Sequence, residues 1–144
     1  MSNISADTVA QYIIKICAER KYHINNFRLQ KLLYFAQASS LVSRKMPLFT
    51  DQILAYDFGP VVKCVYDKYK VYALGDLGVV YRELDCTLPK EEASIVKDVI
   101  DSLLKYSDSD LLKIALRQDP WKESYNRYVR KNIPNELIYS FFMD

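Results

Sequence analysis

Apolar side chains recur at the spacing of an α-helix along most of this chain, and this periodicity constrains the fold more than any single motif does. Few residues interrupt it, because the 144 residues include only 3 glycines and 5 prolines. Half of the residues are apolar and about a quarter are charged, which is the composition of a folded chain of single-domain length. We therefore predict one compact, mainly α-helical domain over residues 1–144, with about six to seven helices and room for a small two-stranded β ribbon.

Capping residues and prolines set the expected helix boundaries. Ser5 and Asn25 precede the first two apolar stripes, and Ser107 opens the pattern of a capping box. Pro60 lies where the first turn of a helix accepts a proline. These signals predict helices over about 6–20, 25–42, 60–71, 90–103 and 107–116, a short turn from Asp119, and a last helix over about 134–142.

The ribbon is expected from two β-prone segments that lie far apart in the chain. Residues 52–56 would form an extended segment with alternating side chains. Residues 79–82 are rich in β-branched and aromatic side chains and follow a turn signal at 75–78. We predict that these two segments pair with each other.

The residues that usually carry catalysis or bind metals are sparse in this sequence. The lone histidine, His23, follows the first predicted helix, and Cys17, Cys64 and Cys86 form no C-x-x-C pair. No phosphate-binding glycine loop or nucleophile elbow is present, and the carboxylate pairs lie at helix caps or on amphipathic helix faces. We therefore expect no catalytic residues, no metal site and no cofactor, and we predict that the protein is not an enzyme.

Hydropathy indicates a cytoplasmic protein, and the charge distribution favours steering of a charged partner over bulk affinity for nucleic acid. No apolar run approaches the roughly 18 residues that a membrane span requires, and residues 1–10 do not resemble a signal peptide. Basic side chains exceed acidic ones in residues 1–75, and the reverse holds for residues 76–110, so opposed charged faces are expected if these segments remain apart in space. The net charge of +2 and the pI near 8.3 are low for a nucleic-acid-binding domain. Nucleic acid is therefore not expected to be the main partner.

Three sequence blocks in the first half of the chain carry a family resemblance. They are LQKLLYFAQA at 29–38, MPLFTDQILAY at 46–56 and FGPVVKCVYDKY at 58–69. Fainter similarity continues in DPWKESY at 119–125 and IYSFF at 138–142. In their order and spacing these blocks resemble the Panacea, or SocA-like, antitoxin domain of bacterial and prophage toxin–antitoxin operons. This family also includes phage-associated GepA-like proteins.

The chain departs from that family pattern at two places. Tyr56 stands where the family commonly has tryptophan, which retains an aromatic ring. Ala115 and Leu116 stand where the family often has a Thr-His pair, so any role of that histidine is absent here.

The resemblance implies an antitoxin of a type II-like system that neutralises a cognate toxin by direct protein–protein binding. Some relatives instead act as adaptors that hand a toxin to a protease, and this alternative remains open. The alternative to an antitoxin function is a phage-associated nucleic-acid-binding or transcriptional regulatory protein. The oligomeric state does not follow from the sequence.

The polar side of the second predicted helix and the turn before the third are the candidate partner surface. Their residues combine polar groups with aromatic rings, as protein interfaces often do. The predicted partner-binding residues are Gln30, Lys31, Tyr34, Gln37, Asp57, Phe58, Gly59 and Pro60. The alternative is that Tyr34 and Phe58 pack inside the domain, and Trp121 is expected to belong to the core.

Overall fold

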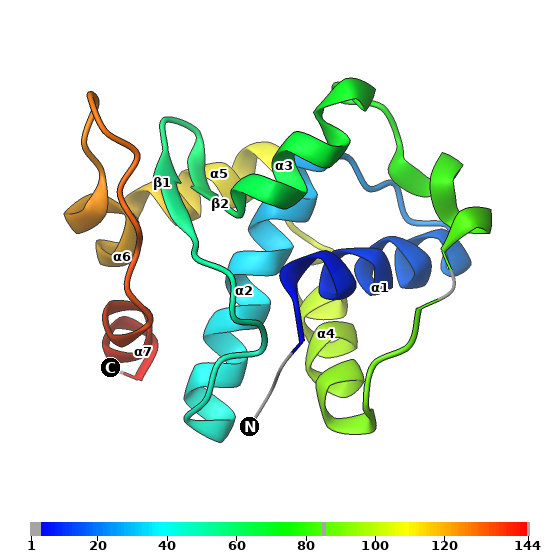
Figure 1. Cartoon of the computed structure of the whole chain (residues 1–144), viewed down its shortest axis with the longest axis horizontal. Helices are drawn as coiled ribbons and strands as arrows, with labels where there is room; N and C mark the ends of the chain where they lie inside the picture. Colours follow the sequence, from blue (N-terminus) through cyan, green and yellow to red (C-terminus); the bar gives the residue numbers. More distant parts are fainter. Residues whose placement is uncertain (1–3, 85, 144) are drawn as a thin grey trace.

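The longest helix, α2, lies at the centre of the fold and other elements surround it (Figure 1). The computed structural model describes residues 4–84 and 86–143. Helices α1 to α7 span Ala6–Glu19, Asn26–Arg44, Lys63–Tyr69, Lys90–Leu103, Asp108–Arg117, Asp119–Ser124 and Asn135–Met143, and the 3-10 helices η1 and η2 span Lys70–Tyr72 and Leu77–Glu83. Helices α1, α4, α5 and α7 all contact α2. The predicted mainly helical fold with a small two-stranded sheet is confirmed.

Local hydrogen bonds explain why three of the helices begin where the sequence predicts. The Ser5 side chain accepts a hydrogen bond from Thr8 N, and the Asn25 side chain accepts one from Arg28 N. Ser107 forms a complete capping box with Asp110. Each cap satisfies a backbone donor that the first helical turn leaves unpaired, so the boundary is encoded by a few neighbouring residues.

The two-stranded sheet is a short antiparallel hairpin, and its pairing differs from the prediction. Strand β1 spans Leu54–Tyr56 and pairs with β2, Gly59–Val61, across a two-residue turn. The predicted helix over 60–71 therefore begins only at Lys63. The predicted partner strand over 79–82 is wrong, because these residues belong to η2. The Asp76 side chain caps that 3-10 helix by accepting from Gly78 N, which favours a helical turn over an extended strand.

A third segment extends the hairpin from the C-terminal part of the chain. Ala55 N donates to Lys131 O at 2.8 Å, and Ile133 N donates to Ile53 O at 2.7 Å. The open edge of β1 is thereby covered, and the hairpin is fixed to the segment that leads into α7. Edge coverage of this kind removes a free strand edge that could pair with other chains.

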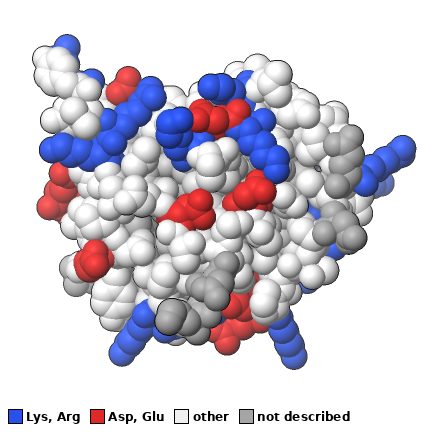
Figure 2. Space-filling model, viewed as in Figure 1, with Lys and Arg blue, Asp and Glu red and all other residues white. Residues whose placement is uncertain are grey.

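Ion pairs join the basic first half of the chain to the acidic segment that follows it. Arg28 donates to Asp108, and Arg44 donates to Glu91 and Glu92 at the start of α4. The two charged segments therefore interleave, so the condition for opposed charged faces is not met. Figure 2 accordingly shows acidic side chains among the basic ones on the face that it presents.

No helix within residues 4–84 and 86–143 has the length and apolar content required to cross a bilayer. Most buried apolar side chains instead form one cluster to which α1, α2, α3, α4 and α7 contribute. Trp121 is half-buried and packs against this cluster.

We expect Arg28→Met to lower the free energy of unfolding by roughly 1.5–3 kcal/mol, because hydrogen bonds from a charged donor contribute about that much. Besides Asp108, the Arg28 guanidinium donates to Leu103 O at 2.7 Å and to Tyr106 O at 2.9 Å, after the end of α4. Urea denaturation measures the change.

Arg20→Met is the matched control, since Arg20 forms a more exposed ion pair with Asp101. A pair of that kind contributes less than about 1 kcal/mol. Equal losses for the two variants would contradict the assigned role of Arg28.

Candidate partner-binding site

The structure places the predicted partner-binding residues of α2 inside the protein. Gln30, Lys31, Tyr34 and Gln37 are each no more than 1% exposed. The pattern predicted an exposed polar face, and that placement is wrong because the hairpin, the segment before it and the chain after α5 cover this side of the helix. Whether these residues contribute to partner binding stays a prediction.

Gln37 organises the irregular segment before the hairpin. Its Oε1 accepts from Leu48 N at 2.8 Å and from Phe49 N at 3.1 Å, and its Nε2 donates to Phe49 O at 3.1 Å. One buried amide therefore replaces the backbone partners that a strand would have supplied. The block at 46–56 follows its path because Gln37 holds it.

Gln30 performs the same task for the end of the hairpin. Its Oε1 accepts from Val62 N at 2.9 Å, and its Nε2 donates to Asn26 Oδ1 at 3.0 Å. Asn26 in turn donates to Tyr66 O in α3. A chain of buried hydrogen bonds thus connects α2 with the hairpin and α3.

Tyr34 links α2 to the C-terminal half of the protein. Its hydroxyl donates to Gln118 Oε1 at 2.7 Å, and its ring packs edge-on against Phe35 and Phe142. Burial raises the pKa of this phenol, so the group stays neutral. Tyr34 therefore packs inside the domain, as the alternative prediction stated.

The tip of the hairpin is the exposed part of the predicted site. Asp57 is exposed and Phe58 is half-buried, whereas Gly59 and Pro60 are buried behind them. Tyr125 donates its hydroxyl to Asp57 Oδ1 at 2.7 Å. The tip is therefore held in place by α6 and the residue after it.

Two aromatic groups support the tip from opposite sides. Trp121 Nε1 donates to Tyr56 O at 2.7 Å, and the Trp121 ring stacks on Tyr125. On the other side Phe58 packs against Tyr66 of α3, with ring centroids 5.5 Å apart. The Pro-Trp block and the Gly-Pro block, which are far apart in sequence, thus meet at this tip.

Lys31 lies directly beneath the tip, and its side chain has no accessible surface. Its Nζ lies 4.5 Å from the centroid of the Phe27 ring and 5.7 Å from that of Phe58. Among the described residues, no group forms a hydrogen bond with this nitrogen. Burial lowers the pKa of Lys31 from 10.5 to about 7, although Asp108 acts in the opposite direction.

Gly59 is required where the hairpin crosses Lys31. Its φ of +109° lies in a region that side chains rarely adopt, and a Cβ atom there would be 2.9 Å from Lys31 Cε. The helix block and the Gly-Pro block are therefore complementary in shape at this point.

The loop at 126–131 adds exposed side chains next to the tip. Tyr128 is 82% exposed and Val129 is 58% exposed. Arg130 lies over the Tyr56 ring, 4.0 Å from its centroid, which places the loop beside the hairpin. The break in helical periodicity at this loop, with an aromatic and an aliphatic residue between arginines, was the signal for an exposed aromatic loop.

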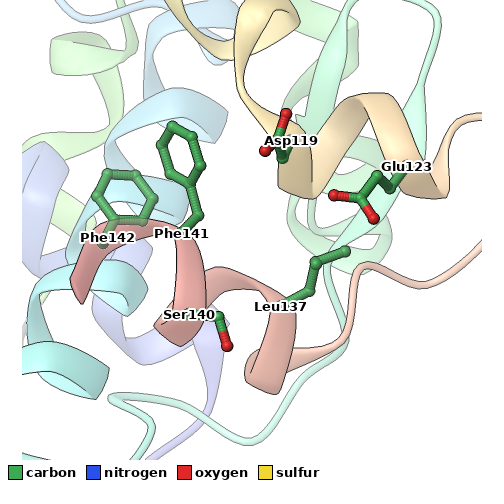
Figure 3. Close-up of a pocket in the computed structure, with 6 residues that line it drawn as sticks. All are labelled: Asp119, Glu123, Leu137, Ser140, Phe141 and Phe142. Atoms are coloured by element: carbon green, nitrogen blue, oxygen red, sulfur yellow. The ribbon is translucent and has the colours of Figure 1, made fainter. Parts of the chain in front are cut away.

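The pocket between α6 and α7 offers no evident chemistry. It encloses about 470 Å³, and Asp119 and Glu123 of α6 face the side of α7 that carries Leu137 and Phe141 (Figure 3). Both carboxylates are exposed, and no hydrogen bond connects them. No cluster of three metal-binding side chains occurs in the part of the chain that the structure describes.

We expect Gln37→Leu to lower the free energy of unfolding by roughly 2–4 kcal/mol, because it leaves buried backbone groups without partners. Urea denaturation measures the loss. Gln11→Leu is the control on α1, since Gln11 bonds only to Asp7 of its own helix. A loss as small as that of the control would contradict the assigned role of Gln37.

We expect Lys31→Met to raise the free energy of unfolding near pH 7 and to remove part of its pH dependence. Between pH 7 and 10.5 the unfolded chain binds a proton that the folded chain has released, so stability rises with pH, by at most about 1.4 kcal/mol per unit. Urea denaturation between about pH 6 and pH 8.5 tests this. The measurements stop below pH 9 because Cys17 would interfere above it. Burial raises the pKa of Cys17 from 9.0 to about 11, so above pH 9 the unfolded chain releases a proton that the folded chain keeps, and stability falls.

Lys90→Met, at an exposed site on α4, removes the same charge without affecting a buried group. This control variant should keep the pH dependence of the wild type. Loss of stability in Lys31→Met at every pH would contradict the prediction.

Comparison with known proteins agrees with this arrangement of blocks. The sequence model of the family described as Antitoxin SocA-like, Panacea domain, matches residues 29–122, from the start of the α2 block to the residue after Trp121. Antitoxin SocA of Caulobacter vibrioides (strain NA1000 / CB15N) is 39% identical over 64 residues, which are 44% of this chain and about a third, 34%, of that protein. No solved structure gives a significant match. Since the family match covers more than half of the chain, the protein belongs to the SocA-like antitoxin family of Panacea-domain proteins.

Proposed function

We propose that this protein is an antitoxin that neutralises a cognate toxin by binding it directly. The observation that carries the proposal is the family match over residues 29–122, whose blocks together build the hairpin tip. The relative from Caulobacter vibrioides is named an antitoxin, although the match covers only part of it. The protein acts by binding, and no chemical step is assigned to it.

The proposed contact area is the tip surface, which we define as Asp57, Phe58, Tyr125, Tyr128 and Val129. It combines aromatic rings with an aliphatic and a charged group, as the centres of many interfaces do. Two hydrogen bonds hold it in place, from Tyr125 to Asp57 and from Trp121 to Tyr56. The Trp121 ring also stacks on the Tyr125 ring. A surface that is ordered before binding loses less conformational entropy when the partner binds.

The other predicted site residues would act through this surface. Gln30 fixes the end of β2, and Gly59 and Pro60 set the path of the hairpin above Lys31. Gln37 and Tyr34 fix the segments that flank the hairpin in sequence and in space. We therefore assign Asp57 and Phe58 to direct contact and the buried residues to positioning the contact surface.

Co-expression with the product of the neighbouring gene tests the proposal. We expect growth to be rescued and the two proteins to co-purify. Asp57→Lys, which reverses a charge at the tip, should weaken the complex about ten-fold or more, as measured by titration calorimetry. Asp98→Lys changes an exposed residue of α4, a helix that lies away from the hairpin (Figure 1), and this variant should bind within about two-fold of wild type.

Failure of both rescue and co-purification would contradict direct neutralisation. Rescue with a falling level of the toxin would indicate delivery to a protease instead. Equal binding by Asp57→Lys and Asp98→Lys would show that the contact surface lies elsewhere.

A further inference from the structure

The buried amine of Lys31 is an unusual group in the core of this domain. A buried ammonium without a partner costs several kcal/mol, so burial of Lys31 does not stabilise the fold as a hydrophobic residue would. The Lys31 side chain reaches its position along α2 and ends beneath two rings, those of Phe27 and Phe58. Its location is therefore better explained by a group that it meets only when a partner is present.

A groove lies on the outer side of the same two rings. It encloses about 290 Å³ and is lined by Asn26, Phe27, Phe58, Tyr66, Lys70, Ala73 and Leu74. Lys31 is not among the residues that line the groove, and its Nζ lies within 6 Å of the centroids of two rings that do line it. Leu74, at the edge of the groove, is 70% exposed.

The charges around this groove favour an acidic ligand. Among the described residues that line it, Lys70 is the only charged one, and Lys31 adds a second amine next to two of the lining rings. Asp108, whose charge acts to raise the pKa of Lys31, already accepts hydrogen bonds from Arg28 at 3.0 Å and from Asn25 at 2.9 Å. Asp67 of α3 is likewise paired with Lys63 of the same helix and with Lys70 of η1.

We propose that this groove receives an aspartate or glutamate side chain of the partner protein, whose carboxylate enters between Phe27 and Phe58 and forms an ion pair with Lys31 Nζ. The apolar lining, which includes Leu74, would contact the aliphatic residues next to that acid. The inference rests on the proposed function, because it specifies how the antitoxin recognises its protein partner.

Movement of the Phe58 ring gives the carboxylate access. Phe58 is half-buried, lies in the turn of the hairpin, and is held by ring contacts with Tyr56 and Tyr66. Phe27 is fixed to α2, so Phe58 is the ring that would be displaced. Only the Phe58 side chain has to rotate, so Asp57 keeps its hydrogen bond to Tyr125 and the backbone of the tip stays in place.

Binding of the partner is measured first, with two matched lysine variants. Lys31→Met keeps the apolar stem and should weaken the complex with the co-purifying toxin about thirty-fold or more, as for loss of one member of a buried charge pair. Lys90→Met removes an equal charge from α4 and should bind within about two-fold of wild type. Circular dichroism and urea denaturation show that each variant is folded. Equal affinity of both variants overturns the inference while leaving the proposed function intact.

A second measurement does not depend on the toxin. The peptides acetyl-Leu-Glu-Leu-amide and acetyl-Leu-Gln-Leu-amide are titrated at millimolar concentration into the full chain carrying ¹³C- and ¹⁵N-labelled lysine. The glutamate peptide should shift the Lys31 Cε signal and raise the pKa of Lys31, since a nearby carboxylate favours the charged amine. The glutamine peptide should do neither. Lys31→Met removes the Lys31 signal, and the two peptides should then have equal effects on the signals of the remaining lysines.

The two measurements separate the inference from the function. A response to the glutamate peptide in a protein that binds no neighbouring gene product would retain the carboxylate site and contradict the antitoxin proposal. Equal responses to the two peptides, or none to either, would overturn the carboxylate site.

Discussion

The polar side of α2 is the feature on which the rest of this structure depends. A helix at the centre of a small fold would ordinarily be apolar all round, but α2 buries two glutamines, a lysine and a tyrosine together with its leucines. Its amide groups bond to backbone atoms of segments that lack regular structure. Because a buried backbone group without a partner is costly, these side chains determine where the chain before and after the hairpin can lie.

Local signals in the sequence were sufficient to predict where helices begin. They were not sufficient to predict how the hairpin and the irregular segments pack on those helices. The caps at Ser5, Asn25 and Ser107 involve residues within three positions of each other, so they could be found without knowledge of the fold. The pairing of β1 depends on contacts at longer range. Residues 79–82 have the side chains of a strand, yet the cap at Asp76 and the adjacent partner at 59–61 decide against it.

The sequence groups the residues of the candidate site on one helix face and one turn, but it does not show how exposed they are. Their role in partner binding stays a prediction. Helical spacing shows that Gln30, Tyr34 and Gln37 share one face of α2, and a polar face on a helix usually meets water. Only the three-dimensional path of the hairpin and of the chain around Gln118 shows that this face is covered. Similarly, nothing in the local sequence indicates that the Lys31 amine ends beneath Phe58.

The motif residues that carry the family resemblance are therefore mostly internal, and this limits what family membership can say about the partner. Gln30, Gln37 and Gly59 hold the hairpin in one path, whichever side chains stand at its tip. Specificity depends on differences in affinity between partners, so it must come from groups that a partner can reach. On this scaffold the groups that we propose for this role are the tip surface, the loop at 126–131 and, after displacement of the Phe58 ring, the amine of Lys31. Lys31 would then have both roles, because its stem packs beneath the hairpin and its amine would form an ion pair with the partner.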